Sequence, residues 1–368
     1  MNDLRDNFPI TQRFKYLNTA NHSPPSTHVR KAIEGFLDDW DNLSRHGDQK
    51  VEWANQSFSK LIKASSEEIA CQPNTSRGLA TVAASIDFER GENVIVNDLE
   101  NWANVYPWTL QAKKGVEVRI VKAHGGEIKL ADIEKRIDDK TKAVSISHVQ
   151  WLTGARHNLR PLADLCHSHG AYLVVDGIQA AGALDVDVRR EDVDFYACGS
   201  YKWLLGPSGA GFLYAKKEHL PDLKPQELGY RAIKEHSLTE PVLHDSAQKL
   251  EFGEPSYLSF VGTKASIDHI LGLGTKRIEK QITTLAQRLY DGLSSIGVKL
   301  VSPENPAIRS GVVSFTTDNP GEHFKHLTEK GYILSLRPAG IRVSCGFFNV
   351  SDEIDALVED VSGLMGRV

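Results

Sequence analysis

The sequence predicts an α/β fold: a large domain built on a mostly parallel sheet between helices, followed by a small α+β C-terminal domain. Two observations lead to this prediction. Between about residues 90 and 215, short apolar runs alternate with amphipathic runs, the pattern of parallel strands joined by covering helices. After about residue 220 the alternation stops, and 368 residues are enough for two domains.

Six apolar runs are predicted to be the strands of the large domain. In chain order they are NVIVN (93–97), VEVRIV (116–121), KAVSISHV (142–149), AYLVVD (171–176), VDFYACG (193–199) and GAGFLYAKK (209–217). A predicted helix, PLADLCHSHG (161–170), precedes the fourth strand and ends at a glycine. Strands separated by helices in this way favour a parallel sheet.

The C-terminal part has a different pattern. A long helix is predicted from Thr275, because apolar residues recur on one helical face: Ile278, Ile282, Leu285, Leu289 and Leu293. SGVVSFTTD (310–318) and GIRVSCGF (340–347) are predicted strands, and a final helix is predicted with Ser351 as its N-cap. We therefore expect a large domain over 16–245 and a small domain over 246–368 that also takes in 1–15.

Composition restricts the class of protein. The net charge is −5 without a basic run, which argues against a nucleic-acid partner. No apolar run approaches the roughly 20 residues that span a bilayer, and no HExxH-like spacing indicates a metal site. The four cysteines are scattered, which is typical of a reducing compartment. We expect a cytoplasmic protein that binds neither membrane, nucleic acid nor metal.

Two charged residues follow predicted strands. Asp176 ends one apolar run and Lys202 follows the next, so both should lie at the edge of the sheet where α/β proteins bind ligands. Taken alone, Asp176 is better explained as a helix cap or turn residue, and Lys202 is also consistent with a side chain that extends past Trp203 to water. A desolvated lysine, however, has a lowered pKa and is a nucleophile able to form a Schiff base.

A third candidate is the segment CQPNTSRGLATVAASI (71–86). Asn74, Thr75 and Ser76 precede helix-forming residues, and hydroxyls with free N–H groups at a helix N-terminus suit a phosphate. By itself the segment is better explained as a simple cap. Together with Lys202 and Asp176 it supplies the protein groups that pyridoxal 5'-phosphate requires.

These motifs carry a family resemblance. VVDGIQAAGALDVDV followed by DVDFYACGSYKWLLGPSGAGFLY resembles the class V aminotransferases, fold-type I pyridoxal-phosphate enzymes that include cysteine desulfurases, selenocysteine lyases, kynureninases and isopenicillin N epimerase-like proteins. The similarity runs from about residue 16 to about residue 358. It implies a fold-type I transferase fold and a homodimer with active sites at the interface.

The resemblance implies roles for five residues that would bind the cofactor. Lys202 matches the Schiff-base lysine, and Asp176 the partner of the pyridine nitrogen. Gln179 matches the residue that hydrogen-bonds the phenolic oxygen. Thr75 and Ser76 match the phosphate-binding pair.

Other positions match the family less uniformly. Tyr201 stands where many relatives have a phosphate-binding histidine, and the triplet SYK resembles the kynureninase branch. Arg342 matches the arginine that binds the substrate carboxylate, a task that suits a bidentate guanidinium. Relatives stack a ring on the cofactor where this chain has Asn101, with Trp102 next, so Trp102 is a candidate for that ring.

Three further departures concern the chemistry. Desulfurases carry a nucleophilic cysteine shortly before the clamp arginine, whereas here no cysteine precedes Arg342, and Cys345 is expected in the core. In relatives, a threonine reaches the cofactor phosphate bound by the partner subunit. Glu254 replaces this threonine here, and Ser256 is the alternative candidate for the same contact. Gln150 lies where a polar residue often contacts substrate or cofactor.

The resemblance implies an enzyme that acts on an α-amino acid through an external aldimine and an α-carbanion, with Lys202 as general base. An aminotransferase is the main expectation. A β-eliminating lyase, either of C–S bonds or kynureninase-like, and an epimerase remain open, as does the identity of the substrate. A non-catalytic α/β binding protein is the remaining alternative. A nucleotide-binding loop is disfavoured, because GPSGAG (206–211) precedes a strand-like run instead of a helix.

Overall fold

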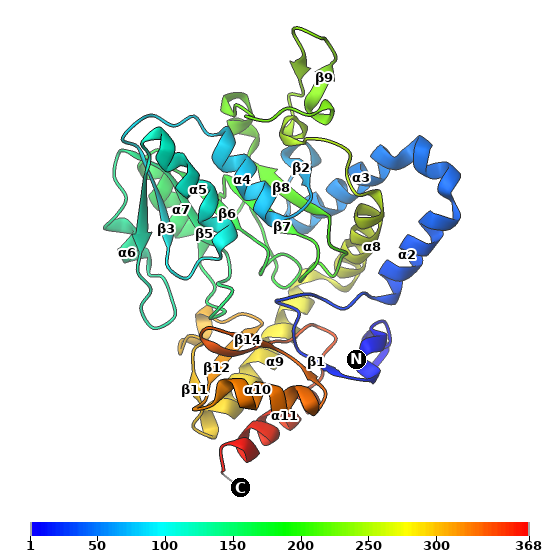
Figure 1. Ribbon diagram of the computed structural model, residues 1–368, viewed down its shortest axis with the longest axis vertical. Coiled ribbons are helices and arrows are strands. Elements are labelled where there is room, and N and C mark those ends of the chain that lie inside the picture. Colours follow the sequence, from blue (N-terminus) through cyan, green and yellow to red (C-terminus); the bar gives the residue numbers. More distant parts are fainter. Residues whose placement is uncertain (1, 367–368) are drawn as a thin grey trace.

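The computed structural model describes residues 2–366 and contains a seven-stranded sheet in the order β2-β8-β7-β6-β5-β3-β4 (Figure 1). The strands are β2 (Ile69–Gln72), β3 (Asn93–Asn97), β4 (Glu117–Val121), β5 (Thr141–Ser147), β6 (Tyr172–Asp176), β7 (Phe195–Gly199) and β8 (Gly211–Ala215). Six of them are the strands predicted from the sequence, and β2 is additional. Among the described strands of this sheet, β8 alone runs opposite to the other six, so the prediction of a mostly parallel sheet is confirmed.

Helices cover both faces of this sheet (Figure 1). They are α2 (Thr27–Asp38), α3 (Trp40–Ile62), α4 (Thr75–Ser85), α5 (Tyr106–Gln111), α6 (Leu130–Glu134), α7 (Leu159–Ser168) and α8 (Tyr257–Leu273). Successive strand residues point to opposite faces. On β7, Phe195 and Ala197 join the core beneath α4 and α5, whereas Tyr196 and Cys198 join the core beneath α3, α7 and α8. Because both faces of the sheet are buried, its strands consist of nearly continuous apolar residues in the sequence.

The small domain contains an antiparallel sheet in the order β11-β12-β15-β14. Its strands are β11 (Lys299–Leu300), β12 (Val312–Thr316), β14 (Ser335–Arg337) and β15 (Gly340–Ser344), and its helices are α9 (Thr275–Ser295), α10 (Pro320–Glu329) and α11 (Ser351–Leu364). The apolar face predicted for α9 is buried. A short α1 (Asn2–Arg5) and a hairpin of β9 (Ile233–Glu235) and β10 (Val242–Leu243) complete the fold.

The N-terminal segment connects the two domains. β1 (Lys15–Tyr16) pairs in parallel with β13 (Tyr332–Ile333) of the small domain. Conversely, α8, which lies within the range predicted for the small domain, packs against α2 and α3 of the large domain. The boundary at residue 246 stays a prediction.

One predicted helix start is wrong by a residue. Ser351 is the first residue of α11, and Val350 occupies the N-cap position without a side-chain cap. The carboxylate of Glu353 instead accepts a hydrogen bond from the Val350 N–H at 3.2 Å. A reciprocal carboxylate of this kind satisfies an N–H group that the helix itself leaves free.

Within residues 2–366, no helix is both long and apolar enough to span a membrane. In the same part of the chain, no group of three or more His, Cys, Asp or Glu side chains is arranged to hold a metal ion.

A buried carboxylate stabilises the start of β7. Asp194 accepts hydrogen bonds from His167 Nε2 at 2.9 Å, from His219 Nε2 at 2.7 Å and from the Leu173 N–H at 2.7 Å. Burial alone would raise the pKa of the Asp194 carboxyl, but these hydrogen bonds outweigh it and lower the pKa to about 2. Asp194 thereby joins α7, β6 and the segment after β8.

We expect Asp194→Asn to lower the free energy of unfolding at pH 7 by about 2 kcal/mol. The folded-state pKa lies below the ordinary value of 3.8, so the stabilisation is complete above pH 3.8 and is lost as the pH falls towards 2. Urea denaturation between pH 7 and pH 3 measures both effects. Asp87→Asn, at an exposed ion pair with Lys224, is the control and should change stability much less, because solvent screens exposed ion pairs. If the two variants lost equal free energy of unfolding at pH 7, the stabilising role of Asp194 would be contradicted.

Candidate active site

The ends of three neighbouring parallel strands bring the predicted catalytic groups together. Asp176 is the last residue of β6, and Lys202 comes three residues after Gly199, the last residue of β7. Asp176 pairs in register with Ala197 of β7 and with Ser147, the last residue of β5. The carboxyl ends of the strands therefore form the crevice that the sequence predicts.

Asp176 and Lys202 influence each other's charge. Burial raises the pKa of the Asp176 carboxyl to about 6, and the negative charge of Glu100 adds to the rise. Two groups oppose it: the Ile178 N–H, which donates to Asp176 at 3.0 Å, and the positive charge of Lys202. Burial lowers the pKa of the Lys202 amine to about 8, with Asp176 opposing and Arg342 assisting. Lys202 therefore loses its proton more readily than an exposed lysine, as a Schiff-base nucleophile must.

Two glycines in DGIQAAG allow this crevice to be closely packed. A Cβ on Gly177 would lie 2.0 Å from the ring of Tyr196, and one on Gly182 would lie 2.3 Å from the backbone oxygen of Trp203. Gly182 also has a φ of +91°, which L side chains rarely adopt. The backbone after Asp176 can thus approach β7 and the loop that carries the lysine.

The N-terminus of α4 lies beside the end of β7. Asn74 caps this helix by accepting the Arg77 N–H at 2.9 Å. Thr75 is buried and its hydroxyl accepts the Gly199 N–H at 2.8 Å, whereas Ser76 is exposed. The first N–H groups of a helix have no partner inside it, so this terminus is suited to an anion. The phosphate-binding roles of Thr75 and Ser76 stay predictions.

Gln179 is held by two protein groups. Its Oε1 accepts the indole N–H of Trp203 at 2.7 Å, and its Nε2 donates to the carbonyl of Ala20 at 3.0 Å. One amide hydrogen therefore remains for a further acceptor. The N-terminal segment that supplies Ala20 was not predicted as part of the site.

Tyr201 lies against the same N-terminal segment. Its ring packs against His22 with the ring planes tilted by 38° and a centroid distance of 4.7 Å, and its carbonyl accepts the Ser23 N–H at 2.9 Å. Lys202 Nζ is 5.7 Å from the centre of the Tyr201 ring. Tyr201 is thus next to the lysine, and its contact with the phosphate stays a prediction.

Asn101 and Trp102 start a short 3₁₀ turn after β3. The Asn101 side chain accepts the Ala103 N–H at 3.1 Å. Trp102 is 61% exposed, and its ring stacks on Tyr106 at 5.4 Å. The Trp102 ring therefore packs on a surface neighbour, and its stacking on the cofactor stays a prediction.

Arg342 of β15 brings a buried cation to the crevice. The side chain is only 1% exposed, its Nη1 donates to the Trp151 carbonyl at 2.8 Å, and its buried Nε has no partner. Burial, and then the charge of Arg337, lower the pKa of Arg342. Within the described residues no carboxylate pairs with this guanidinium. A buried, uncompensated arginine is suited to an anionic ligand.

A second arginine, Arg337, was missed in the sequence. Its Nη2 donates to Asn21 Oδ1 at 2.7 Å, its buried Nε has no partner, and its guanidinium lies 6.0 Å from the Trp151 ring centre. It also contributes to the lowered pKa of Lys202. The sequence does contain a feature that could have identified Arg337. In LRPAGIR two arginines are close together, and the structure places them on the paired strands β14 and β15.

All four cysteines are buried and none is in a disulfide bond. Cys345 lies in the core of the small domain, as expected, and burial raises the pKa of its thiol to about 12. Neutral, buried thiols are poor nucleophiles. No described residue of this chain therefore offers an accessible thiol.

Three weaker candidates are engaged within the protein. Glu254 accepts a hydrogen bond from the Tyr230 hydroxyl, and Ser256 Oγ lies 2.8 Å from Ser259 Oγ. Gln150 is buried and donates to Glu100 at 2.8 Å. The contact of residues 254–256 with a partner subunit stays a prediction.

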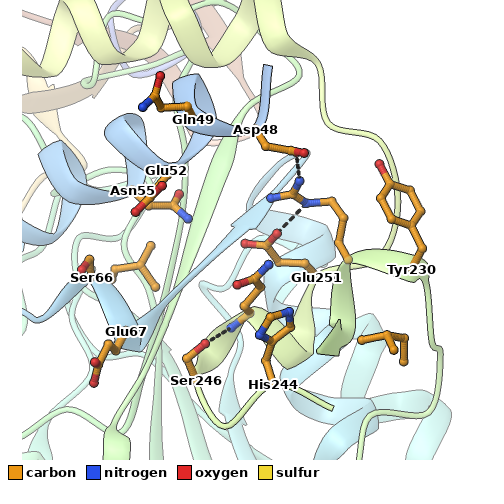
Figure 2. A pocket seen from close by; sticks show the side chains of 14 residues that line it. Asp48, Gln49, Glu52, Asn55, Ser66, Glu67, Tyr230, His244, Ser246 and Glu251 are labelled. Atoms are coloured by element: carbon orange, nitrogen blue, oxygen red, sulfur yellow. Dashed lines mark hydrogen bonds and ion pairs between the residues drawn. The ribbon is translucent and has the colours of Figure 1, made fainter. Parts of the chain in front are cut away.

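A separate cavity of about 510 Å³ lies between α3 and the base of the β9–β10 hairpin. In Figure 2, Asp48 and Glu251 point at one guanidinium group, that of Arg231. These ion pairs neutralise Arg231 and hold the base of the hairpin to α3. The cavity contains none of the predicted site residues, so we assign it a structural role.

Comparison with known proteins identifies the family. Residues 38–357 match the class-V aminotransferases. A probable cysteine desulfurase from Methanothermobacter thermautotrophicus is 30% identical over 99% of this chain and 98% of its own length. The apo structure of a cysteine desulfurase from Thermococcus onnurineus NA1 superimposes with a TM-score of 0.92 at 26% identity, covering 100% of this chain and 98% of that one.

The structure of a cystine C–S lyase in complex with its product cysteine persulfide is also similar. It superimposes with a TM-score of 0.89 at 24% identity, and the match covers 96% of this chain and 99% of that one. This similarity shows a shared fold. The names of the relatives favour the lyase alternative over the aminotransferase expectation.

The crevice fits the cofactor of this family on its own chemistry. A lysine with a lowered pKa lies beside a buried carboxylate, and a helix N-terminus capable of binding an anion adjoins both. The chain belongs to the class-V aminotransferase family and is a pyridoxal-phosphate-dependent enzyme with the fold-type I architecture.

Proposed function

We propose that the protein is a C–S lyase that releases sulfur from a cysteine-type amino acid by β-elimination. The observation that carries this proposal is the burial of all four thiols in a chain whose relatives are named cysteine desulfurases. A sulfur atom that leaves the substrate finds no accessible cysteine to receive it. Elimination, which needs only a base and an electron-withdrawing cofactor, requires no such acceptor.

Arg342 binds the α-carboxylate of the substrate in this proposal. Its guanidinium is buried, already oriented by the Trp151 carbonyl, and lacks an anion of its own. A carboxylate therefore replaces an unfavourable uncompensated charge with a charge-assisted pair. Arg337 would bind a second carboxylate of a substrate such as cystine, because it adds a further cation without a carboxylate partner beside Trp151.

The cofactor residues divide the remaining tasks. Lys202 would attach the cofactor and Asp176 would pair with its pyridine nitrogen. Gln179 would donate to the phenolic oxygen, and the α4 N-terminus with Tyr201 would hold the phosphate. When bound, pyridoxal phosphate withdraws electrons from the substrate's α-carbon. Lys202 Nζ then takes the α-proton, a role that its lowered pKa supports.

The overall elimination balances without an oxidant or a reductant. The α-proton goes to Lys202 Nζ, the Cβ–S bond breaks, and its electron pair leaves on sulfur. Water converts the remaining three-carbon unit to pyruvate and ammonia. Cysteine would yield sulfide as the sulfur product, and cystine would yield cysteine persulfide.

A homodimer and a cytoplasmic location belong to the same proposal. Two exposed apolar side chains beside the segment 254–256, Tyr230 and Phe252, support contact with a second subunit. The unpaired cysteines support a reducing compartment.

We expect the purified protein to convert cysteine or cystine to pyruvate with equimolar release of sulfide or persulfide. Iodoacetamide applied to the folded protein should leave the rate unchanged within about twofold, because the thiols are buried and neutral. Pyruvate, alanine and the pyridoxamine form of the cofactor are quantified together. Alanine formation that alkylation abolishes would indicate a desulfurase, and accumulation of the pyridoxamine form would indicate an aminotransferase.

Reduction of the cofactor-loaded protein with borohydride should attach pyridoxyl phosphate to the peptide that contains Lys202, as read by mass spectrometry. Lys202→Ala should abolish this labelling. Lys249→Ala is the matched control, because burial also lowers the pKa of Lys249, but its Nζ donates to the Leu220 carbonyl away from the site. Labelling that persists in Lys202→Ala would contradict the role of Lys202.

Two arginine variants test the carboxylate contacts. Arg342→Lys should raise KM for cysteine and for cystine by roughly 10- to 100-fold, since a lysine cannot form the bidentate pair. Arg337→Lys should lower kcat/KM about tenfold for cystine and leave cysteine within about twofold, because cysteine has one carboxylate. Steady-state kinetics with both substrates measure this. Equal losses on both substrates in Arg337→Lys would exclude its role in binding a second carboxylate.

A further inference from the structure

Glu100, in the turn after β3, is a buried carboxylate that only hydrogen-bond donors surround. Its two oxygens accept five bonds: from Asn97 Nδ2 at 2.6 Å, Asn104 Nδ2 at 3.0 Å, Ser147 N–H at 2.8 Å, Ser147 Oγ at 2.5 Å and Gln150 Nε2 at 2.8 Å. Each of these five groups has a hydrogen to donate, and donated hydrogen bonds stabilise a carboxylate in its charged form.

No cation compensates this charge. Among the described residues, no lysine, arginine or histidine forms an ion pair with Glu100. His157 lies near, with its Nδ1 2.8 Å from the Ser147 carbonyl, but burial lowers the pKa of its imidazole and keeps it neutral. A buried anion of this kind is costly unless a positive charge arrives from outside the chain.

Glu100 lies one strand away from Asp176. It binds both the N–H and the hydroxyl of Ser147, and Ser147 pairs in register with Asp176. Its negative charge contributes to the raised pKa of Asp176. The other titratable groups that face Asp176 come from β7 and the loop after it: Tyr196, Cys198, Tyr201 and Lys202. Of these, only Lys202 is positively charged.

We propose that Glu100 is a positioning residue that keeps the cofactor's pyridine nitrogen protonated, by adding a fixed second negative charge behind Asp176 and by holding Ser147 and Gln150 in place. One buried carboxylate facing Lys202 is partly neutralised by that lysine. A second anion restores a negative potential at the end of β6, where a pyridinium is the cation that the network lacks. The role concerns the cofactor alone and holds whichever reaction the enzyme performs.

Glu100→Gln tests the charge at nearly constant size. We expect the cofactor-loaded variant to be folded, with the pH midpoint of its visible absorption band shifted down by about one unit, and pyridoxal phosphate to bind about tenfold more weakly. Glu100→Asp should keep the midpoint within about 0.3 units of the parent protein, because the charge remains. Neither readout involves an amino-acid substrate, so failure here leaves the C–S lyase proposal untouched.

Glu353→Gln is the matched control for the loss of a buried carboxylate. Glu353 is equally buried and multiply hydrogen-bonded, but lies in α11, where it pairs with Arg5. The Glu353→Gln variant should have a lower thermal stability and an unchanged pH midpoint of the cofactor's visible absorption band. An unshifted midpoint and unchanged cofactor affinity in Glu100→Gln would overturn the proposal, as would an equal shift in Glu353→Gln.

If Glu100→Gln does not fold, Gln150→Leu tests the positioning of the same carboxylate. Gln150 Nε2 donates to Glu100 at 2.8 Å, so its loss frees one carboxylate oxygen to move and should shift the pH midpoint of the bound cofactor's absorption. An unshifted midpoint in this variant would overturn the proposal.

Discussion

The burial of Lys202 beside Asp176 is the interaction on which the rest of the active site depends. Burial lowers the pKa of the lysine to about 8 and raises the pKa of the aspartate to about 6. The Asp176 charge offsets part of the burial cost at Lys202, whereas Asp176 is stabilised first by the Ile178 N–H and then by the Lys202 charge. The three parallel strands β5, β6 and β7 impose this proximity, since their carboxyl ends meet at one edge of the sheet.

The small domain completes the crevice because its sheet and the N-terminal segment are joined to the large domain by polar contacts. Arg342 donates to the Trp151 carbonyl, and Ser314 donates to the Leu152 carbonyl at 2.6 Å. Ala20 accepts a bond from Gln179 and donates to Ser344 Oγ at 2.9 Å. The candidate substrate and cofactor residues from distant parts of the chain are thereby held in one arrangement.

The distribution of charge also limits the chemistry. Three cations, Lys202, Arg337 and Arg342, face the crevice, and among the residues that the structure describes the carboxylates that act on Lys202 or Asp176 are Asp176 and Glu100. The arginines favour an anionic substrate, whereas the two carboxylates favour a cation at the end of β6. With the thiols buried, covalent transfer of sulfur to this chain has no evident acceptor, and elimination is the simpler course.

The sequence by itself determined six strands of the large sheet, the strands β12 and β15, the helices α9 and α11, and the placement of Asp176 and Lys202 at strand ends. Those features follow from local periodicity and from the rule that parallel strands end at one edge. It also located Arg342, although only through a family resemblance. The burial of Cys345 could be expected for the same reason as the core strands, because it extends an apolar strand.

Only the tertiary structure decided which polar groups are already engaged. The surface packing of Trp102, the two partners of Gln179 and the position of Arg337 all depend on contacts between segments far apart in sequence. Glu100 is the clearest case: its five donors come from three segments between residues 97 and 150. Sequence periodicity shows which face of an element is apolar, but hydrogen bonds across the fold decide which charges remain available to a ligand.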